Sequence, residues 1–291
     1  MGDGSTKIFM ESEEFGIHQN WSCFLVDNGS LRPEPVLQLR EIACSLGALL
    51  EVPVHPVGLL HSAKVDPARL GGIPALEMEP ALENFLEFPL PQDVVVLPQF
   101  FGPSRALTEF LPWKLRELGK KAGERGIQLR QAAGLYDPGD DSGEVLSGIL
   151  ADRVGEVMKA AQWTRLPRVI LVDHGSAVPE VVAARRAVAR ELRVMLSGFT
   201  CGVVECSMER PDGADAQVSP LLSEVLEQAQ GDEPLVLAMM FFANGRHAGP
   251  GGDVEQICRE HAKGEWVRTA PIGNHPALVQ LLAKRAVQAM Q

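Results

Sequence analysis

The segment Phe24-Leu-Val-Asp-Asn-Gly-Ser30 indicates the architecture of this chain, because it returns later as Ile170-Leu-Val-Asp-His-Gly-Ser176. Each copy is a short apolar run followed by Asp, one polar residue, Gly and Ser. A second pair follows in the same order, with Pro80-Ala-Leu-Glu-Asn-Phe-Leu-Glu87 returning as Pro220-Leu-Leu-Ser-Glu-Val-Leu-Glu227. Repeated segments in a kept order indicate a structural unit that is present twice.

A third pair extends this repeat over most of the chain. Residues 94–101 followed by Arg105 correspond to residues 235–242 followed by Arg246, and each arginine stands four positions beyond the second phenylalanine. The offset between the copies drifts from 146 to 140 or 141, as insertions and deletions in loops would produce. We therefore predict an internal duplication, with one unit in residues 1–161 and the other in residues 162–291.

Within each unit, apolar runs of strand length alternate with segments of helical period. This alternation is typical of a parallel sheet covered by helices on both faces. The expected fold class is α/β, with two similar doubly wound lobes. Strands are predicted at residues 23–26, 94–97, 169–172 and 235–240, and helices at 39–50, 80–87, 108–124, 179–196, 253–262 and 276–290.

The composition of the 291-residue chain excludes some classes of partner. With 27 Lys and Arg against 38 Asp and Glu, the net charge is −11, which disfavours nucleic acids and anionic membranes. No apolar run reaches 18 residues, and no leader peptide is recognisable at the N-terminus. The five cysteines form no Cys-x-x-Cys pair. We expect a cytoplasmic protein whose cysteines are buried thiols.

Two histidines stand where such a fold collects its ligands. His174 directly follows a predicted strand, and His247 lies in the loop after another one, 73 positions later. Ligands of open α/β sheets bind beyond the carboxyl ends of the strands, so both side chains are expected in one crevice. Neutral imidazole binds Co²⁺, Fe²⁺, Ni²⁺ and Zn²⁺, and it also accepts a proton near neutral pH.

The second half of the chain resembles the class II tetrapyrrole chelatases, in the longer form that carries two fused copies. Three segments carry this resemblance in the order of the family: Val172-Asp-His-Gly-Ser176, Phe241-Phe-Ala-Asn-Gly-Arg-His247 and Ala270-Pro-Ile-Gly-Asn-His-Pro-Ala-Leu278. The resemblance implies a lyase that inserts Co²⁺, Fe²⁺ or Ni²⁺ into sirohydrochlorin or a related tetrapyrrole, in cobalamin or siroheme biosynthesis. His174 and His247 would hold the metal and assist proton removal. The metal is a substrate, and no organic cofactor is implied.

The first half departs from this pattern at both histidines. Asn28 stands where the second half has His174, and Ala106 stands where it has His247. We therefore interpret residues 1–161 as a degenerate chelatase-like lobe that shapes the cleft, and residues 162–291 as the lobe that carries the histidine site.

The remaining candidate residues follow from the carboxylate-rich substrate that the resemblance implies. Arginine pairs carboxylates bidentately, which makes Arg105, Arg210 and Arg246 candidate substrate-binding residues, together with Ser176. Glu209 is a possible proton acceptor. Two alternatives remain: a non-catalytic carrier of a metal or tetrapyrrole, and, much less favoured, a histidine phosphatase suggested by Gly245-Arg-His247.

Overall fold

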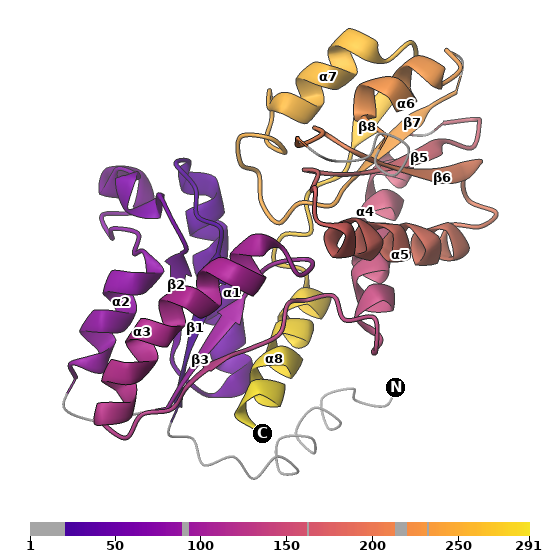
Figure 1. The fold of residues 1–291 in the computed structure, drawn as a ribbon. Coiled ribbons are helices and arrows are strands. Elements are labelled where there is room, and N and C mark those ends of the chain that lie inside the picture. Colours follow the sequence, from indigo (N-terminus) through magenta and orange to yellow (C-terminus); the bar gives the residue numbers. More distant parts are fainter. Residues whose placement is uncertain (1–20, 89–92, 162, 213–219, 232) are drawn as a thin grey trace, which may run out of the picture.

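The computed structural model describes residues 21–88, 93–161, 163–212, 220–231 and 233–291, and it contains two parallel sheets (Figure 1). The first sheet has the strand order β2-β1-β3-β4 and the second has the order β6-β5-β7-β8. The equal order, with parallel pairing throughout, confirms the predicted α/β fold with two similar lobes. The strands are β1 (Trp21–Asp27), β2 (Val54–Gly58), β3 (Asp93–Pro98), β4 (Leu129–Gln131), β5 (Arg168–Asp173), β6 (Gly202–Ser207), β7 (Leu235–Met239) and β8 (Trp266–Arg268).

Six of the eight α-helices in the described residues overlap predicted ranges, whereas those at residues 142–161 and 222–228 were not predicted. Proline occupies the first position of the helices Pro33–Leu50, Pro179–Met195 and Pro276–Met290, where its missing N–H has no partner to lose. The helices are α1 (Pro33–Leu50), α2 (Met78–Leu86), α3 (Leu111–Glu124), α4 (Ser142–Ala161), α5 (Pro179–Met195), α6 (Leu222–Gln228), α7 (Asp253–His261) and α8 (Pro276–Met290). A π-helical turn, Ala106–Phe110, leads into α3.

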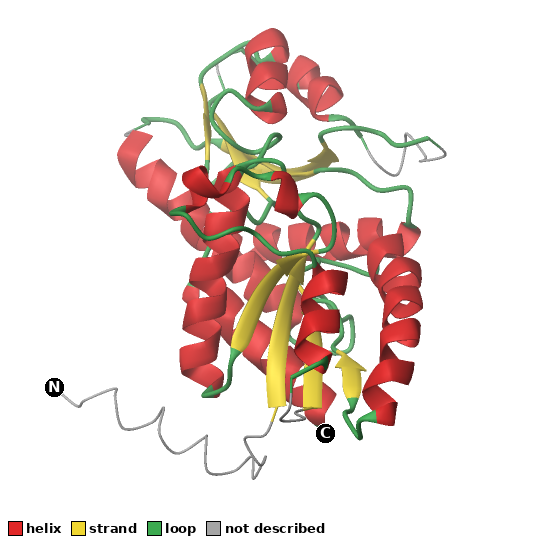
Figure 2. Cartoon of the chain, turned by 90° about the vertical axis from the view of Figure 1, so that its left-hand side faces the viewer, coloured by secondary structure: helices red, strands yellow, loops and turns green. Residues whose placement is uncertain are grey.

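The sequence pattern did not predict β2, β4, β6 or β8. β4 and β8 have only three residues each, and both include an arginine. The central strands β1, β3, β5 and β7 were predicted, because a strand that is covered on both faces is almost entirely apolar. Figure 2 shows the strands of the lower lobe between helices on both sides.

Each lobe is completed by a helix from the other half of the sequence. α4 packs on α5 and β7, whereas the C-terminal α8 packs on α1 and β3 (Figure 1). We define lobe 1 as β1–β4 with α1, α2, α3 and α8, and lobe 2 as β5–β8 with α4 to α7. The sequence division between residues 161 and 162 stays a prediction about the repeated units, and the packing of α4 and α8 crosses it.

A buried arginine holds α8 in lobe 1. Arg285 donates to the carbonyl oxygens of Gly134 and Leu135, at 2.9 and 2.7 Å, and pairs with Asp140 at 2.6 Å. Arg285 is 2% exposed. Hydrogen bonds from Arg285 and Ser142 keep the pKa of Asp140 well below its ordinary value, although burial acts in the opposite direction. The exchange of helices is therefore fixed by polar contacts as well as apolar packing.

The two lobes share one continuous apolar core. It includes strand residues of both sheets and the inner faces of α1, α4, α5 and α8. Against this core Phe101, after β3, stacks on Phe242, after β7, with ring centroids 4.0 Å apart and planes at 10°. The carboxyl ends of β3 and β7 are thereby brought together across the boundary between the lobes.

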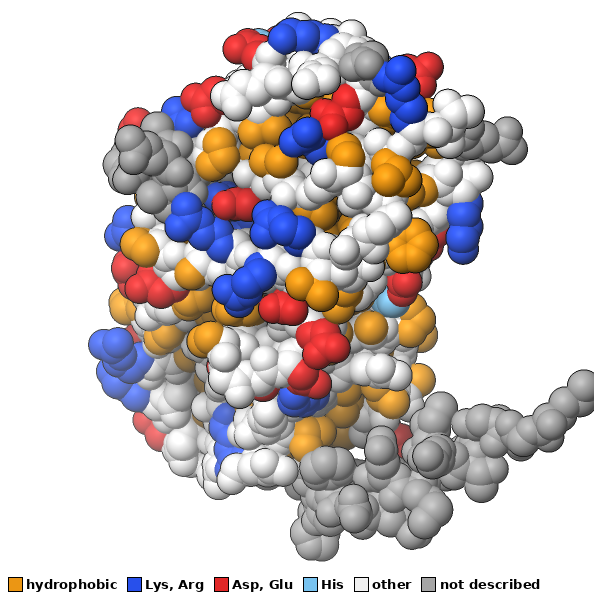
Figure 3. Space-filling view, turned by 90° about the vertical axis from the view of Figure 1, so that its right-hand side faces the viewer, with side chains coloured by type: hydrophobic (Ala, Val, Ile, Leu, Met, Phe, Trp, Pro, Cys, Tyr) orange, Lys and Arg blue, Asp and Glu red, His pale blue; other side chains and the backbone are white. Residues whose placement is uncertain are grey.

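The surface is mixed in charge. On the face drawn in Figure 3, Lys and Arg side chains in the middle are flanked by Asp and Glu, with apolar side chains between them. Among the described residues, no helix combines the length and the apolar character that a membrane crossing needs.

Candidate functional site

The position of His174 is set by a close approach of two loops at the ends of β5 and β6. Gly175 has φ of +106°, and a Cβ there would lie 2.1 Å from the carbonyl oxygen of Glu209. The Glu209 N–H donates to the carbonyl of His174 at 3.2 Å. Only glycine allows this approach, and the approach puts the two side chains together. His174 Nε2 lies 3.3 Å from Glu209 Oε1, and both side chains are about half exposed.

His247 lies in the loop that connects β7 to α7. The loop is tight: a Cβ at Gly252 would lie 2.5 Å from the carbonyl oxygen of Arg246, and one at Gly249 would lie 2.6 Å from that of Gly245. Asp253 is the first residue of α7, and its Oδ2 lies 2.6 Å from His247 Nδ1. A carboxylate on Nδ1 orients the ring and leaves Nε2 to bind a ligand.

The two histidines lie side by side. Their ring centroids are 4.8 Å apart and the ring planes are at 80°. The side chain of His174 is 48% exposed and that of His247 is 32% exposed, so solvent reaches both. Within the described ranges, no three or more His, Cys, Asp or Glu side chains are grouped so as to hold a metal ion. The site thus offers two neighbouring imidazoles, each with a carboxylate partner.

A buried ion-pair cluster lies directly behind His174. Arg185 of α5 is fully buried, pairs with Asp173 at 3.0 Å and also pairs with Glu205 of β6. Burial raises the pKa of Asp173, although the Arg185 charge opposes this rise. Neither this cluster nor the contact of Asp253 was predicted from the sequence. The only sequence signals were an acidic residue at the end of one strand and an acidic residue at the start of α7.

The four predicted substrate-binding residues lie in different surroundings. Arg246 is 75% exposed and lies 3.5 Å from Asp253, next to His247. Arg105 belongs to lobe 1, where it pairs with Glu109 on an exposed helix turn. Arg210 pairs with Glu224 at 2.9 Å. Ser176 Oγ accepts the N–H of Val178 at the start of α5. Of these four, Arg246 has a contact with the histidine site through Asp253.

Lobe 1 repeats the backbone of the site without its imidazoles. Asp27 ends β1 as Asp173 ends β5, and a Cβ at Gly29 would lie 1.6 Å from the carbonyl oxygen of Leu60. Asn28 thus occupies the position of His174, and Leu60 that of Glu209. After β3, the N–H of Ser104 donates to Gly102, as the N–H of Gly245 donates to Ala243 after β7, which places Ala106 where lobe 2 has His247.

Comparison with solved structures shows how widely this two-lobed fold occurs. "SirB from Bacillus subtilis with Fe3+" matches with a TM-score of 0.64 and 16% identity, covering 93% of this chain and 95% of that one. CbiX, described as the terminal enzyme for biosynthesis of siroheme in denitrifying bacteria, matches with a TM-score of 0.58 and 15% identity over 93% and 100%. The chelatase-like, multi-domain DR2241 from Deinococcus radiodurans matches with a TM-score of 0.56 and 18% identity, over 94% of this chain and 56% of that one. At these identities the likeness shows the fold.

The amino-acid sequence is similar to one protein family over its second half. No curated protein matches the chain. The model of the CbiX family matches residues 168–289, the stretch that begins with β5, includes both histidines and ends within α8. Residues 168–289 are therefore similar to the CbiX family, within a chain that has the two-lobed fold described above.

Proposed function

We propose that this protein inserts a divalent metal ion into sirohydrochlorin or a closely related tetrapyrrole, at the site formed by His174 and His247. The observation that carries the proposal is the 4.8 Å separation of the two imidazole rings. Two imidazoles that share a cation at about 2.1 Å, at an angle near that of a tetrahedron, have ring centroids about 5 Å apart. The observed separation of the two rings is therefore close to the one that a shared ion requires.

A site with only two imidazoles suits an ion that must be passed on. Structural metal sites use four protein ligands and hold their ion tightly, whereas open sites leave positions for other ligands. Here those positions would be taken by water and then by the pyrrole nitrogens. Imidazole is a good ligand for Co²⁺, Fe²⁺ and Ni²⁺ alike, so the metal is set by supply as well as by the site.

Insertion of one divalent ion releases two N–H protons from the macrocycle, and the site has groups to receive them. Glu209, 3.3 Å from His174 Nε2, is partly exposed and can accept a proton from the substrate and deliver it to solvent. Asp253 holds His247 through Nδ1 and stabilises its charged form if the ring takes up a proton. The carboxylates thus keep a base next to each imidazole.

Substrate binding is assigned to the exposed arginine of this site. The side chain of Arg246 is 75% exposed and shares Asp253 with His247. A guanidinium at this place would pair with a peripheral carboxylate of the tetrapyrrole. Arg105, Arg210 and Ser176 remain weaker proposals for this role, because each is engaged within its own lobe.

The five cysteines are free thiols, which favours a reducing compartment such as the cytoplasm.

The test is anaerobic incubation with sirohydrochlorin and Co²⁺, Fe²⁺ or Ni²⁺ in turn, followed by absorption spectra. We expect insertion with at least one ion, at a rate that falls by roughly 10²–10⁴-fold in His174→Ala and in His247→Ala. Asn28→Ala is the matched control, because it changes the equivalent residue of lobe 1. Thermal unfolding should show little change, since both histidines are partly exposed.

Each outcome decides between catalysis and its main alternative. If the protein binds the metal or the tetrapyrrole tightly but gives no turnover with any ion, it is a carrier and the enzyme proposal is wrong. If both histidine variants insert metal at the wild-type rate, the chemistry lies elsewhere.

A further inference from the structure

The ion-pair cluster of lobe 2 has an incomplete counterpart in lobe 1. Asp173 corresponds to Asp27, since each is the last residue of its central strand. Arg185 is the seventh residue of α5, and the seventh residue of α1, which also begins with proline, is Leu39. Glu205 pairs in register with Leu171, two positions before Asp173. Its counterpart, paired with Leu25, is Pro56.

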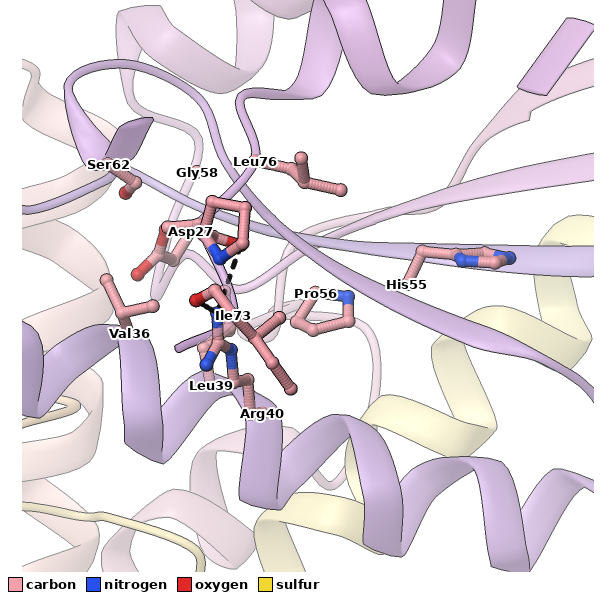
Figure 4. A pocket seen from close by; sticks show the side chains of 12 residues that line it. Asp27, Val36, Leu39, Arg40, His55, Pro56, Gly58, Ser62, Ile73 and Leu76 are labelled. Carbon is pink, nitrogen blue, oxygen red and sulfur yellow. Dashed lines mark hydrogen bonds between the residues drawn. The ribbon is translucent and has the colours of Figure 1, made fainter. Parts of the chain in front are cut away.

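These three counterparts line one cavity. A cavity of about 180 Å³ opens beside Asp27, Leu39 and Pro56, and its other walls include Val36, Ile73, Ala75 and Leu76 (Figure 4). In lobe 2 the positions equivalent to Leu39 and Pro56 carry Arg185 and Glu205, which pair with each other. The cavity therefore lies beside the positions that hold a guanidinium and its second carboxylate in the other lobe. It has room for on the order of six water molecules.

Asp27 has no cation of its own. Among the described residues, its carboxylate accepts a hydrogen bond from the N–H of Gly29 at 2.9 Å and forms no ion pair. Burial raises the pKa of Asp27 to about 7, and backbone hydrogen bonds oppose this rise. A largely desolvated carboxylate without an ion-pair partner is costly even where it is only partly buried, as Asp27 is, so a cation that fits the cavity gains a charge-assisted hydrogen bond.

Two basic side chains, Arg40 and His55, also line the cavity, but each is engaged with other groups. Arg40, on the same helix as Leu39, donates to the carbonyl oxygens of Leu70, Ile73 and Pro74 at 2.8 to 3.1 Å. Figure 4 shows the ring of His55 turned away from Asp27 and Arg40. His55 packs against Phe24 instead, with centroids 4.7 Å apart, and its burial lowers its pKa. Neither group neutralises Asp27.

We propose that the Asp27 cavity of lobe 1 binds a small organic cation, a guanidinium or ammonium group on a short apolar chain. The cation would stand in for the Arg185 side chain of lobe 2, with its charged end on Asp27 and its chain along Leu39 and Ile73. This site is separate from the histidine site and adds a ligand-binding function to the lobe that lacks the imidazoles.

The test uses ethylguanidinium as the probe and its neutral isostere, N-ethylurea, as the comparison. Titration at pH 8 would follow the backbone amide of Gly29 by NMR, with calorimetry for the affinity. We expect saturable binding of ethylguanidinium, and binding of N-ethylurea weaker by about tenfold or more, since only the cation pairs with the carboxylate. Lowering the pH to 6 should weaken the binding, because protons then compete for Asp27, while Arg40 stays charged and His55 stays outside the contact.

Three variants make the test decisive. Asp27→Asn removes the charge but can still accept the hydrogen bond from Gly29. It should weaken the binding of ethylguanidinium by about tenfold or more. Leu39→Arg restores the guanidinium of lobe 2 and should abolish binding. Glu41→Gln, on the same helix, should bind as the wild type does. Equal affinity of the wild type and Asp27→Asn, equal affinity for ethylguanidinium and N-ethylurea, or the absence of a saturable Gly29 shift would each overturn the proposal.

Discussion

The two lobes keep the same strand order and the same glycine at the end of the central strand, yet they differ in what stands beside that glycine. Lobe 2 has His174 and Glu209 above a buried cluster in which Arg185 neutralises two carboxylates. Lobe 1 has Asn28 and Leu60 above Asp27, which has no charged partner among the described residues. The imidazoles and the cluster beneath them are thus present together in one lobe and absent together in the other.

This co-occurrence suggests that the buried cluster supports the histidine. Asp173 precedes His174 directly, and its side chain is tied to Arg185, which is itself tied to β6, the strand that leads to Glu209. A buried ion pair adds little to net stability, but it fixes the positions of the groups it joins. Lobe 1 has no imidazole to position, and there Leu39 and Pro56 stand at the places of Arg185 and Glu205.

The largest effect is expected when lobe 2 is made to resemble lobe 1 beneath the site. Arg185→Leu leaves Asp173 and Glu205 buried without a cation, which costs about 3–5 kcal/mol of unfolding free energy. The loss should be smaller at acid pH, because burial raises the pKa of Asp173 and protonation removes its unpaired charge. Denaturant unfolding at pH 8 and pH 5 measures both effects. Arg186→Leu, a half-exposed neighbour that also reaches Glu205, is the control and should cost under about 1 kcal/mol. Equal stability of Arg185→Leu and the wild type would contradict the supporting role.

The next effect concerns the orientation of His247. Asp253→Asn keeps an acceptor for the ring N–H but removes its charge, and we expect metal affinity and insertion rate to fall by roughly 10–100-fold. In Asp253→Ala both quantities should fall further, because the His247 ring loses its hydrogen-bond partner altogether. Since Asp253 acts through His247, the pH profile of insertion should also shift in both variants. Metal titration and the pH dependence of the rate test this. An unchanged pH profile in both variants would mean that Asp253 serves only α7.

The strand ends that carry this comparison could be predicted from the sequence, whereas the contacts around them could not. The apolar run before His174 predicts a buried strand. The repeat predicts that Asn28 and Ala106 occupy the positions of His174 and His247 in the first lobe. His247 and Asp253 are in side-chain contact across a glycine-rich loop. The hydrophobic periodicity of the sequence does not predict such a contact. Arg185 stands next to Arg186 on a helix, where two adjacent charges look solvent-exposed, although the first is fully buried.

The exchange of α4 and α8 escaped prediction for a similar reason. Their apolar stripes predict that one face of each helix is buried, but a stripe does not name the surface that covers it. Arg285 would have been a signal, since an arginine on the buried side of a helix needs partners. Its partners, Gly134, Leu135 and Asp140, are about 150 positions away in the sequence.

A pH-dependent effect on stability is expected from the unpaired carboxyl of lobe 1. The pKa of Asp27 is about 7 in the folded protein and near 3.8 ordinarily, so the folded state holds this proton more tightly than the unfolded state. Asp27 therefore lowers stability progressively as the pH rises from about 4 to 7, by at most about 1.4 kcal/mol per pH unit. Asp27→Asn should be more stable than the wild type at pH 8, with the difference shrinking towards pH 5. Chemical denaturation at both pH values measures it, and a difference independent of pH would contradict the shifted pKa.

The smallest effect is expected at the equivalent arginines of the two lobes. Arg246 and Arg105 hold the same repeat position, and both are more than 70% exposed, but only Arg246 shares a carboxylate with a site histidine. Because an exposed ion pair contributes about 0.2–1 kcal/mol, Arg246→Ala should weaken tetrapyrrole binding only by a factor of about 1.4 to 5, and Arg105→Ala by less. Metal binding without the tetrapyrrole should stay unchanged in both, since neither guanidinium is a ligand. Tetrapyrrole affinity at low and high salt separates the two, because screening should reduce the difference between wild type and Arg246→Ala. If Arg105→Ala weakens binding as much as Arg246→Ala does, both lobes contact the substrate with equal weight, and the assignment of binding to the histidine lobe alone is wrong.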